Sequence, residues 1–383
     1  MNLFFTLFIC LCLTSCSNND ITFNDISNKE LSRGLSTIQT AKDFYKYWEN
    51  LETSQERQVV IKYLEDNKLS HILETIDKKN EGEFINLRSG IVVKKIGDKY
   101  CLSDDIILTE KQLNILSETY NSNYWKNIKL ERSDTKEILL AKFAKEYPHV
   151  VFPSYNEIKN YVKGYRKHLQ SRGAAQVGLV MFDLWDEEEI PYTFSSNFPE
   201  TKKNKVLDAI AYWNSFYQTT KYKFVTRSNQ SDFIEFTLGE GNSSYVGRIG
   251  GKQEITLDQN YFSFGNVVHE IGHAIGLLHE QCKENRDNFV VIHSGNIENG
   301  KQHNFVRQNV NCAQFDEFDW GSIMLYDSYA FTNNGLPTMT KKSDGSTWEV
   351  QRDTLSQDDI NIIPKMVEMS IIATYIYLMG GGN

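Results

Sequence analysis

The sequence has no basic stripe, no long acidic run, no internal repeat and no low-complexity segment. Its formal net charge of −9 is spread along 383 residues, which argues against nucleic acid as a partner. With 40% hydrophobic and 13% aromatic residues, the chain can bury a sizeable core and is long enough for two domains. A disordered protein is therefore excluded.

Long hydrophobic runs are also missing. The N-terminal stretch MNLFFTLFICLCLTSC is too short to anchor the chain across a bilayer, so we interpret residues 1–16 as an export signal. Its end, Leu13-Thr14-Ser15-Cys16, resembles the lipobox of bacterial lipoproteins, in which the cysteine is lipidated and becomes the new N-terminus. That reading predicts a membrane-anchored protein facing the periplasm or the cell surface. An ordinary secretory signal is the alternative, because no Lys or Arg precedes the apolar run.

Cysteine is scarce outside the leader. Only Cys101, Cys282 and Cys312 follow Cys16. In an oxidising compartment Cys282 and Cys312 could form a disulfide, and Cys101 would then be unpaired. The alternative is that Cys282 and Cys312 are two free thiols.

The pattern of apolar and polar residues changes near residue 183. Before it, residues 41–67 and 154–170 show helical periodicity, on either side of a strand-like island at 90–108. After it, the pattern predicts a helix at 202–218 and strands at 190–194, 221–225, 232–238 and 243–257. Mixed helices and strands over this length are typical of a single α+β domain.

We therefore expect four parts. They are a leader at 1–16, a largely helical region at 17–175, an α+β domain at 176–368 and a tail at 369–383. The tail has about ten apolar residues, too few for a membrane span, and is expected as a packed last segment or a loose end.

The densest group of reactive side chains is HEIGHAIGLLHEQ at 269–281. On a helix His269 and His273 lie on one face, so both imidazoles can reach one ion. Gly276 can take a left-handed conformation, end the helix and return His279 to the same point. Three neutral nitrogen donors with an open position suit one catalytic Zn²⁺, because closed structural sites more often use thiolates.

Glu270 follows the first ligand and could hold a water bound to that ion. It would take the proton of the water during attack on a peptide carbonyl and then protonate the leaving amine. A bare H-E-x-x-H often arises by chance on a helix, but the added Gly276 and His279 make chance a poor explanation. The motif therefore predicts metal-assisted hydrolysis of an amide.

The extended pattern H-E-x-x-H-x-x-G-x-x-H is that of the metzincin proteases, and GSIMLYD at 321–327 supplies their methionine turn. Glu280, NIENGKQHNF at 296–305 and LWDEEEIPYTF at 184–194 narrow the resemblance to the astacin family, over about 185–366. The resemblance implies a metzincin fold: a twisted, mostly parallel sheet with long helices and a zinc cleft between two subdomains.

The resemblance also implies roles for single residues. Tyr326 would bind zinc at rest and swing to stabilise the oxyanion, and a core aromatic is the alternative. Met324 would form the hydrophobic floor under the metal, and Glu280 would lie near the buried new N-terminus after activation. An extended peptide would pair with the strand Ser244-Tyr245-Val246-Gly247-Arg248.

The sequence departs from the family pattern in its cysteines. Those of the two usual domain disulfides are missing, with Lys221 and Asn242 where two of them would fall. Leu325 replaces a common histidine. No metal ligand is lost, and a Cys282–Cys312 bond would be a substitute for the missing disulfides.

Residues 17–175 would then be a pro-region, in which an acid occupies the zinc in place of water. LSDDI at 102–106 resembles the F-x-G-D motif of the family and puts Asp105 at the zinc-binding acid. Cys101 is the alternative ligand, because a thiolate binds zinc well, and a solvated turn is the third possibility. An activating protease would cut near Arg172, in the Gly/Ala-rich stretch 170–178.

Two functions follow. The first is an exported zinc endopeptidase, made as a zymogen, that acts on protein or peptide substrates. The second is a zinc-containing lipoprotein that binds a peptide without cleaving it, for which the missing disulfides are the only support. A protein that only bound peptides would have no need of Glu270.

Overall fold

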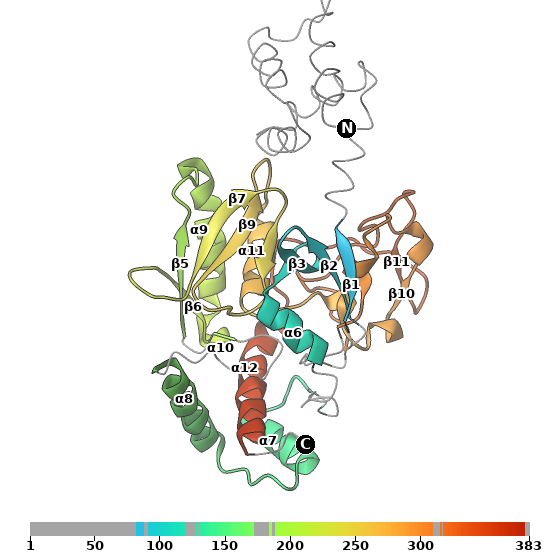
Figure 1. Cartoon of the computed structure of the whole chain (residues 1–383). Coiled ribbons are helices and arrows are strands. Elements are labelled where there is room, and N and C mark those ends of the chain that lie inside the picture. Colours follow the sequence, from blue (N-terminus) through green and yellow to red (C-terminus); the bar gives the residue numbers. More distant parts are fainter. Residues whose placement is uncertain are drawn as a thin grey trace, which may run out of the picture. The chain divides into compact units, whose positions relative to one another are not determined.

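The structure, a computed structural model, describes residues 82–87, 91–118, 128, 130–171, 184–185, 188–308, 315 and 317–379 (Figure 1). The chain divides into two compact units, and all described helices and strands belong to the second, Glu83–Asn383. Four predicted features lie outside the described residues: the leader with Cys16, the helix at 41–67, the cut site at Arg172, and Cys312.

A nine-stranded sheet is the centre of this unit, in the order β1-β2-β3-β4-β8-β9-β7-β5-β6. The strands of this sheet that follow residue 183 are β5 Glu189–Phe194, β6 Lys223–Thr226, β7 Phe233–Gly239, β8 Ser243–Tyr245 and β9 Lys252–Asp258. Of these, β5, β6, β7 and β9 run parallel, and β8 runs antiparallel to β9. This is the mostly parallel sheet that the sequence predicts, with the strands at the predicted positions. Strands β10 Val290–Ile292 and β11 Met339–Lys341 pair in a separate two-stranded sheet.

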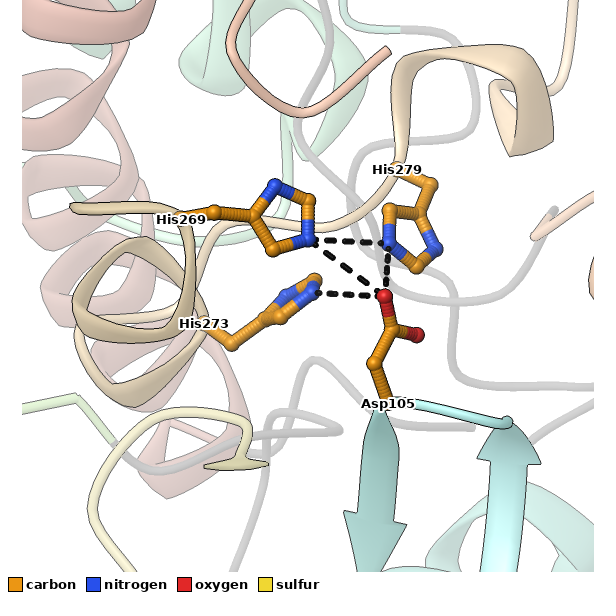
Figure 2. A group of neighbouring side chains, drawn as sticks. All are labelled: Asp105, His269, His273 and His279. Carbon is orange, nitrogen blue, oxygen red and sulfur yellow. Dashed lines mark hydrogen bonds and ion pairs between the residues drawn. The ribbon is translucent and has the colours of Figure 1, made fainter. Parts of the chain in front are cut away.

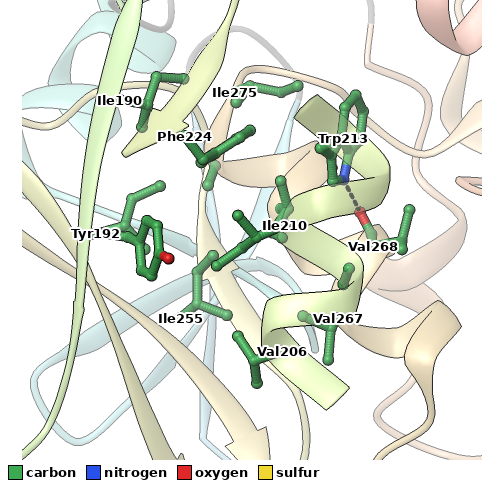
Figure 3. Close-up of a cluster of buried hydrophobic side chains, with 14 of the residues drawn as sticks. Ile190, Tyr192, Val206, Ile210, Trp213, Phe224, Ile255, Val267, Val268 and Ile275 are labelled. Carbon is green, nitrogen blue, oxygen red and sulfur yellow. Dashed lines mark hydrogen bonds between the residues drawn. The ribbon is translucent and has the colours of Figure 1, made fainter. Parts of the chain in front are cut away.

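Helices α9 (Glu200–Ser215) and α11 (Phe264–Ala274) enclose the main core against this sheet (Figure 3). The buried side chains of α9, Val206, Ile210 and Trp213, follow the three- and four-residue steps of one helix face. The indole N–H of Trp213 donates to the carbonyl of Val268 at 3.1 Å. Each large apolar side chain buried there contributes about 1.5–3 kcal/mol, so this core holds α11 firmly against the sheet.

Four strands from the predicted pro-region extend the same sheet: β1 Glu83–Asn86, β2 Val92–Ile96, β3 Lys99–Ser103 and β4 Ile106–Leu108. Successive strands pair antiparallel, and β4 pairs in parallel with β8. The strand-like island at 90–108 is thus β2 to β4. The prediction of strands in this stretch is confirmed, whereas β1, ahead of it, was not predicted.

The remaining helices of this region are α6 (Glu110–Glu118), α7 (Lys136–Glu146) and α8 (Tyr155–Ser171). Helix α8 is the one predicted at 154–170, whereas α7 was not predicted. The side chain of Thr135 caps α7 by accepting from the amide of Ile138.

Helix α12 (Gln357–Leu378) ends the described chain. It begins with a capping box between Ser356 and Asp359, and its last turns pack against α7 and α8. The segment from 369 is therefore a packed continuation of this helix. Among the helices that the structure describes, none combines the length and apolarity that a membrane span requires.

Candidate metal centre

The helix that carries the first two histidines ends as the sequence predicts. Gly276 has φ +114°, the amide of Leu277 donates to the carbonyl of Gly272 at 2.9 Å, and that of Gly276 donates to His273 at 2.9 Å. A Cβ at position 276 would lie 2.6 Å from the end of the Leu184 side chain, which would have to move, and the positive φ itself favours glycine.

This turn brings His279 back to the face of α11 that carries His269 and His273 (Figure 2). The Nε2 atoms of His269 and His279 are 3.4 Å apart. Nδ1 of His269 lies 2.9 Å from the carbonyl of Ile323, and Nδ1 of His273 lies 2.8 Å from that of Leu277. Because these carbonyls accept the Nδ1 protons, the lone pairs of Nε2 point at the common centre.

Asp105 is the fourth member of this group, and it comes from the turn between β3 and β4. Its Oδ2 lies 3.0 Å from Nε2 of His279, 3.4 Å from that of His269 and 4.0 Å from that of His273 (Figure 2). The ligand atoms of all four residues lie within 4.8 Å of one another. Burial would raise the pKa of Asp105, but His279 and a hydrogen bond with His269 hold it well below its usual value.

The four residues fit a zinc ion. Nε2 of His273 is buried and has no hydrogen-bond partner among the described residues. Burial lowers the pKa of His269 to about 4 and that of His273 well below its usual value, so both rings stay neutral, as metal ligands must. Three imidazole nitrogens and one carboxylate oxygen form a donor set that zinc favours.

Cys101 does not join this group. It lies on β3 opposite Ile107, and burial raises the pKa of its thiol to about 11. A neutral thiol is a poor zinc ligand. The structure thus brings Asp105, rather than Cys101, to the three histidines.

Two further side chains with possible roles in catalysis lie beside the centre. Glu270 is buried, its Oε2 has no hydrogen-bond partner within the described part of the chain, and burial followed by the charge of Asp105 raises its pKa well above the usual value. The hydroxyl of Tyr326 donates to both oxygens of Asp105 at 3.2 Å. Its ring centroid lies 4.5 Å from that of His279, in an apolar cluster, so Tyr326 is both a buried aromatic and a donor at the centre.

Met324 lies beneath α11, as the resemblance implies. Its sulfur is so close that a Cβ at Gly272 would lie 3.0 Å from it. Asp359 fixes this turn by accepting from the hydroxyl of Ser322 at 2.6 Å and from the amide of Ile323 at 2.9 Å. We did not predict Asp359, although its place three residues after Ser356 marks a helix start.

Just beyond the third histidine, Glu280 is half-buried and Cys282 is buried. Glu280 accepts from the ammonium of Lys283 at 3.2 Å and from the amide of Asp319 at 2.9 Å, and burial raises its pKa. The Sγ of Cys282 lies 3.3 Å from the carbonyl oxygen of Asn304. Because Cys312 lies outside the described residues, a Cys282–Cys312 bond stays a prediction.

The strand predicted to bind a peptide is shorter than expected and already has a partner. Only Ser244 and Tyr245 of 244–248 lie in β8, where they pair with Ile106 and Ile107 of β4. The amide of Ser244 donates to the carbonyl of Asp105 at 2.9 Å.

The remaining residues of 244–248 are also engaged. The carbonyl of Val246 accepts from Gln112 of α6 at 2.9 Å, and that of Gly247 accepts from Gln253 at 2.9 Å. Arg248 lies outside the strand and pairs with Asp232 at 2.7 Å. Residues of the predicted pro-region therefore occupy this edge.

Asp104, in the same turn as Asp105, contacts residues 301–304 of the predicted α+β domain. Asp104 lies 2.6 Å from Nζ of Lys301 and 3.2 Å from Nε2 of His303, and its amide donates to Oδ1 of Asn304 at 2.8 Å. Burial would raise the pKa of Asp104, but His303 and Lys301 lower it. A cavity of about 410 Å³ opens beside this turn, between Asn242 on one side and Tyr326 on the other.

Comparison with known proteins agrees with this geometry. The model of the peptidase family Astacin matches residues 180–368. Zinc metalloproteinase nas-4 of Caenorhabditis elegans is 36% identical over 190 residues, which cover 49% of this chain and 59% of nas-4. Astacin-like metalloprotease toxin 5 of Loxosceles gaucho is 35% identical over 154 residues, which cover 39% of this chain and 81% of the toxin. The alignment with nas-4 thus spans less than two thirds of that relative.

Among solved structures, high choriolytic enzyme 1, a hatching enzyme zinc-protease from Oryzias latipes, is 27% identical with a TM-score of 0.44. That match covers 51% of this chain and 97% of the enzyme. The family match, the zinc motif and the mostly parallel sheet confirm the expected fold class. The chain belongs to the astacin family of zinc metalloproteases.

Proposed function

We propose that this protein is an exported zinc endopeptidase held latent by its own pro-segment. The position of the Asp105 carboxylate, between the Nε2 atoms of three histidines, carries the proposal. Asp105 comes from a turn between two strands that precede the family-matched region, whereas the histidines lie inside it. An acid in that place excludes water and substrate from the centre.

His269, His273 and His279 would hold the zinc, with Asp105 as the fourth ligand of the latent form. Zinc bound there would lower the pKa of a water towards 7 and polarise a peptide carbonyl. Proton transfer and stabilisation of the transition state would be carried out by Glu270 and Tyr326. Both steps require Asp105 to have left the centre.

Glu270 is suited to move a proton. Its carboxyl group is buried, which raises its pKa and makes the carboxylate a stronger base that could take a proton and return it to the leaving amine. Oε2 has no hydrogen-bond partner among the described residues, which supports this role.

Tyr326 is suited to stabilise developing negative charge. Its hydroxyl already donates to a carboxylate at the centre. Once Asp105 has left, the same donor can serve a substrate oxygen that becomes negative in the transition state. Met324 supports the histidines from below.

Activation in this proposal removes the strand β4 from β8. The edge of β8 would then pair with an extended segment of a protein or peptide substrate. An activating protease would cut near Arg172, and Glu280 would lie near the new N-terminus. The leader at 1–16 would export the chain, and lipidation at Cys16 would anchor it to a bacterial membrane with the protease domain facing outward, from which activation can release it.

Casein hydrolysis by the trimmed protein tests the proposal, with wild type compared with Glu270→Ala at equal zinc content. We expect the wild type to cleave casein and the variant to lose activity by about 10²-fold or more. Phenanthroline should abolish the activity and added zinc should restore it. Equal residual activity in the two proteins would end the proposal and favour a peptide-binding role.

A further inference from the structure

The last turns of α12 are buried by α7 and α8, two helices that precede the family-matched region in the sequence. Met369, Ile372 and Ile376 of α12 share one apolar cluster with Leu139 and Phe143 of α7 and with Ile158 and Val162 of α8. Figure 1 shows α7 and α8 on either side of this end of α12, and contacts join α12 to both. The apolar residues named here are buried almost completely.

Most of this contact lies outside the family match. That match covers residues 180–368, so α7 and α8 precede it and the turns of α12 from Met369 follow it. Phe315, inside the match, also belongs to the cluster. The two additions therefore bury most of their apolar faces against each other.

Polar contacts bind the same helices together. Nζ of Lys365, which is buried, donates to the carbonyls of Asp134 at 2.7 Å and Glu131 at 3.2 Å. The hydroxyl of Tyr375 donates to the carbonyl of Val151 at 3.0 Å. These bonds end on backbone carbonyls, which gives the contact a defined geometry.

The inhibitory strands are attached elsewhere. Their apolar residues belong to a separate cluster, to which the family-matched region contributes Val246 and Leu278. Their polar attachments are the pairing of β4 with β8, Gln112 at the carbonyl of Val246, Asp105 at the metal centre and Asp104 at Lys301. Residues 83–118 and 130–171 are therefore held to the protease domain by independent contacts.

We propose that α7 and α8 stay bound to α12 after activation, as a noncovalent second chain of the mature protease, and that only the segment with β1 to β4 leaves. If α7 and α8 also left, the apolar face of α12 around Ile372 would be exposed to water. The proposal rests on the proposed function in that activation cuts the chain ahead of the protease domain, and it requires a second cut between α6 and α7.

The test uses the full chain with Glu270→Ala, which prevents self-digestion. Recognition sequences of a site-specific protease replace residues 120–126 and 173–178, both outside the described residues. After complete cutting, size-exclusion chromatography and intact-mass analysis report which fragments remain together. We expect the fragment from about 127 to 172 to elute with the protease domain in a 1:1 ratio, with the amides of 369–378 as protected from hydrogen exchange as in the uncut protein.

Elution of the protease domain alone, with exchange at 369–378 accelerated, would overturn the proposal. As a matched pair, Ile158→Asp should release the fragment, whereas Ile138→Asp, on the exposed side of α7, should leave it bound. If Ile158→Asp prevents folding, the fragment ratio and the exchange data from the cut Glu270→Ala protein still decide whether the fragment stays bound. Retention requires no catalysis, so a failed casein assay and a released fragment are separate outcomes.

Discussion

Oδ2 of Asp105 lies 3.0 Å from Nε2 of His279, although 174 residues separate the two in the sequence. The contact exists because β4 pairs in parallel with β8, which brings the preceding turn to the metal centre. The amide of Ser244 fixes the carbonyl of Asp105 at the same time. Asp105 is therefore held through its backbone by β8 and through its side chain by the histidines.

Replacement of Asp105 should activate the uncut precursor. Asp105→Ala removes the carboxylate from the centre, and a loss of about 1.4 kcal/mol in closed-state stability already raises the open fraction tenfold. We expect casein hydrolysis by the uncut variant at least about tenfold above that of the uncut wild type. Cys101→Ser is the control and should stay latent, because its thiol is not in the group. If the Cys101→Ser variant were active instead, Cys101 rather than Asp105 would be the residue that keeps the precursor latent.

Tyr326→Phe should reduce turnover without loss of metal. The variant keeps the ring in its apolar cluster but removes the donor, so kcat should fall by about 10²-fold while KM changes little. Zinc content by atomic absorption and steady-state kinetics on the activated enzyme would measure this. Tyr329→Phe changes an exposed neighbour and should have no effect. An unchanged kcat in Tyr326→Phe would show that the hydroxyl serves only the latent form.

Asp359→Ala should destabilise the fold. It leaves the amide of Ile323 and the hydroxyl of Ser322 buried without their acceptor, at a cost of about 1–3 kcal/mol for each group. Urea unfolding should show a loss of about 2–5 kcal/mol, while the exposed Asp353→Ala should match the wild type. If both variants unfold alike, Asp359 does not hold the methionine turn.

The metal-free protein should lose stability in mild acid. Burial lowers the pKa of His269 from 6.5 to about 4, so the unfolded chain binds more protons than the folded one between those values. Stability is therefore complete above about pH 6.5 and falls as the pH approaches 4. At about 1.4 kcal/mol per pH unit, His269 accounts for about 3 kcal/mol.

Thermal unfolding between about pH 7.5 and 4, with and without zinc, would check this dependence. Zinc should move the loss to lower pH because it competes with protons for the rings. His269→Gln should flatten the profile of the metal-free protein, and His149→Gln, at an exposed site, should not. A metal-free protein equally stable across this range would contradict the prediction.

The zinc helix and the strands after residue 183 could be predicted because their signals are local. His269, His273 and Gly276 act through helix spacing and one backbone conformation, both of which a short stretch determines. The apolar steps of α9 are of the same kind.

What the sequence did not reveal depends on distant contacts. The parallel pairing of β4 with β8, the hold of Asp359 on the methionine turn and the cover of α12 by α7 each join segments more than thirty residues apart. No local pattern predicts such pairs, since tertiary contacts decide them. Strand β1 was missed for another reason, since it has only four residues and becomes a strand by pairing with its sequence neighbour β2.

The pairing of β4 with β8 also affects solubility. Without β1 to β4, β8 would be an open sheet edge with unpaired N–H and C=O groups, which is a template for intermolecular strand addition. In the precursor the outer edge is β1, a short and mostly exposed strand that begins with Glu83. The segment with β1 to β4 would thus also protect the chain from aggregation.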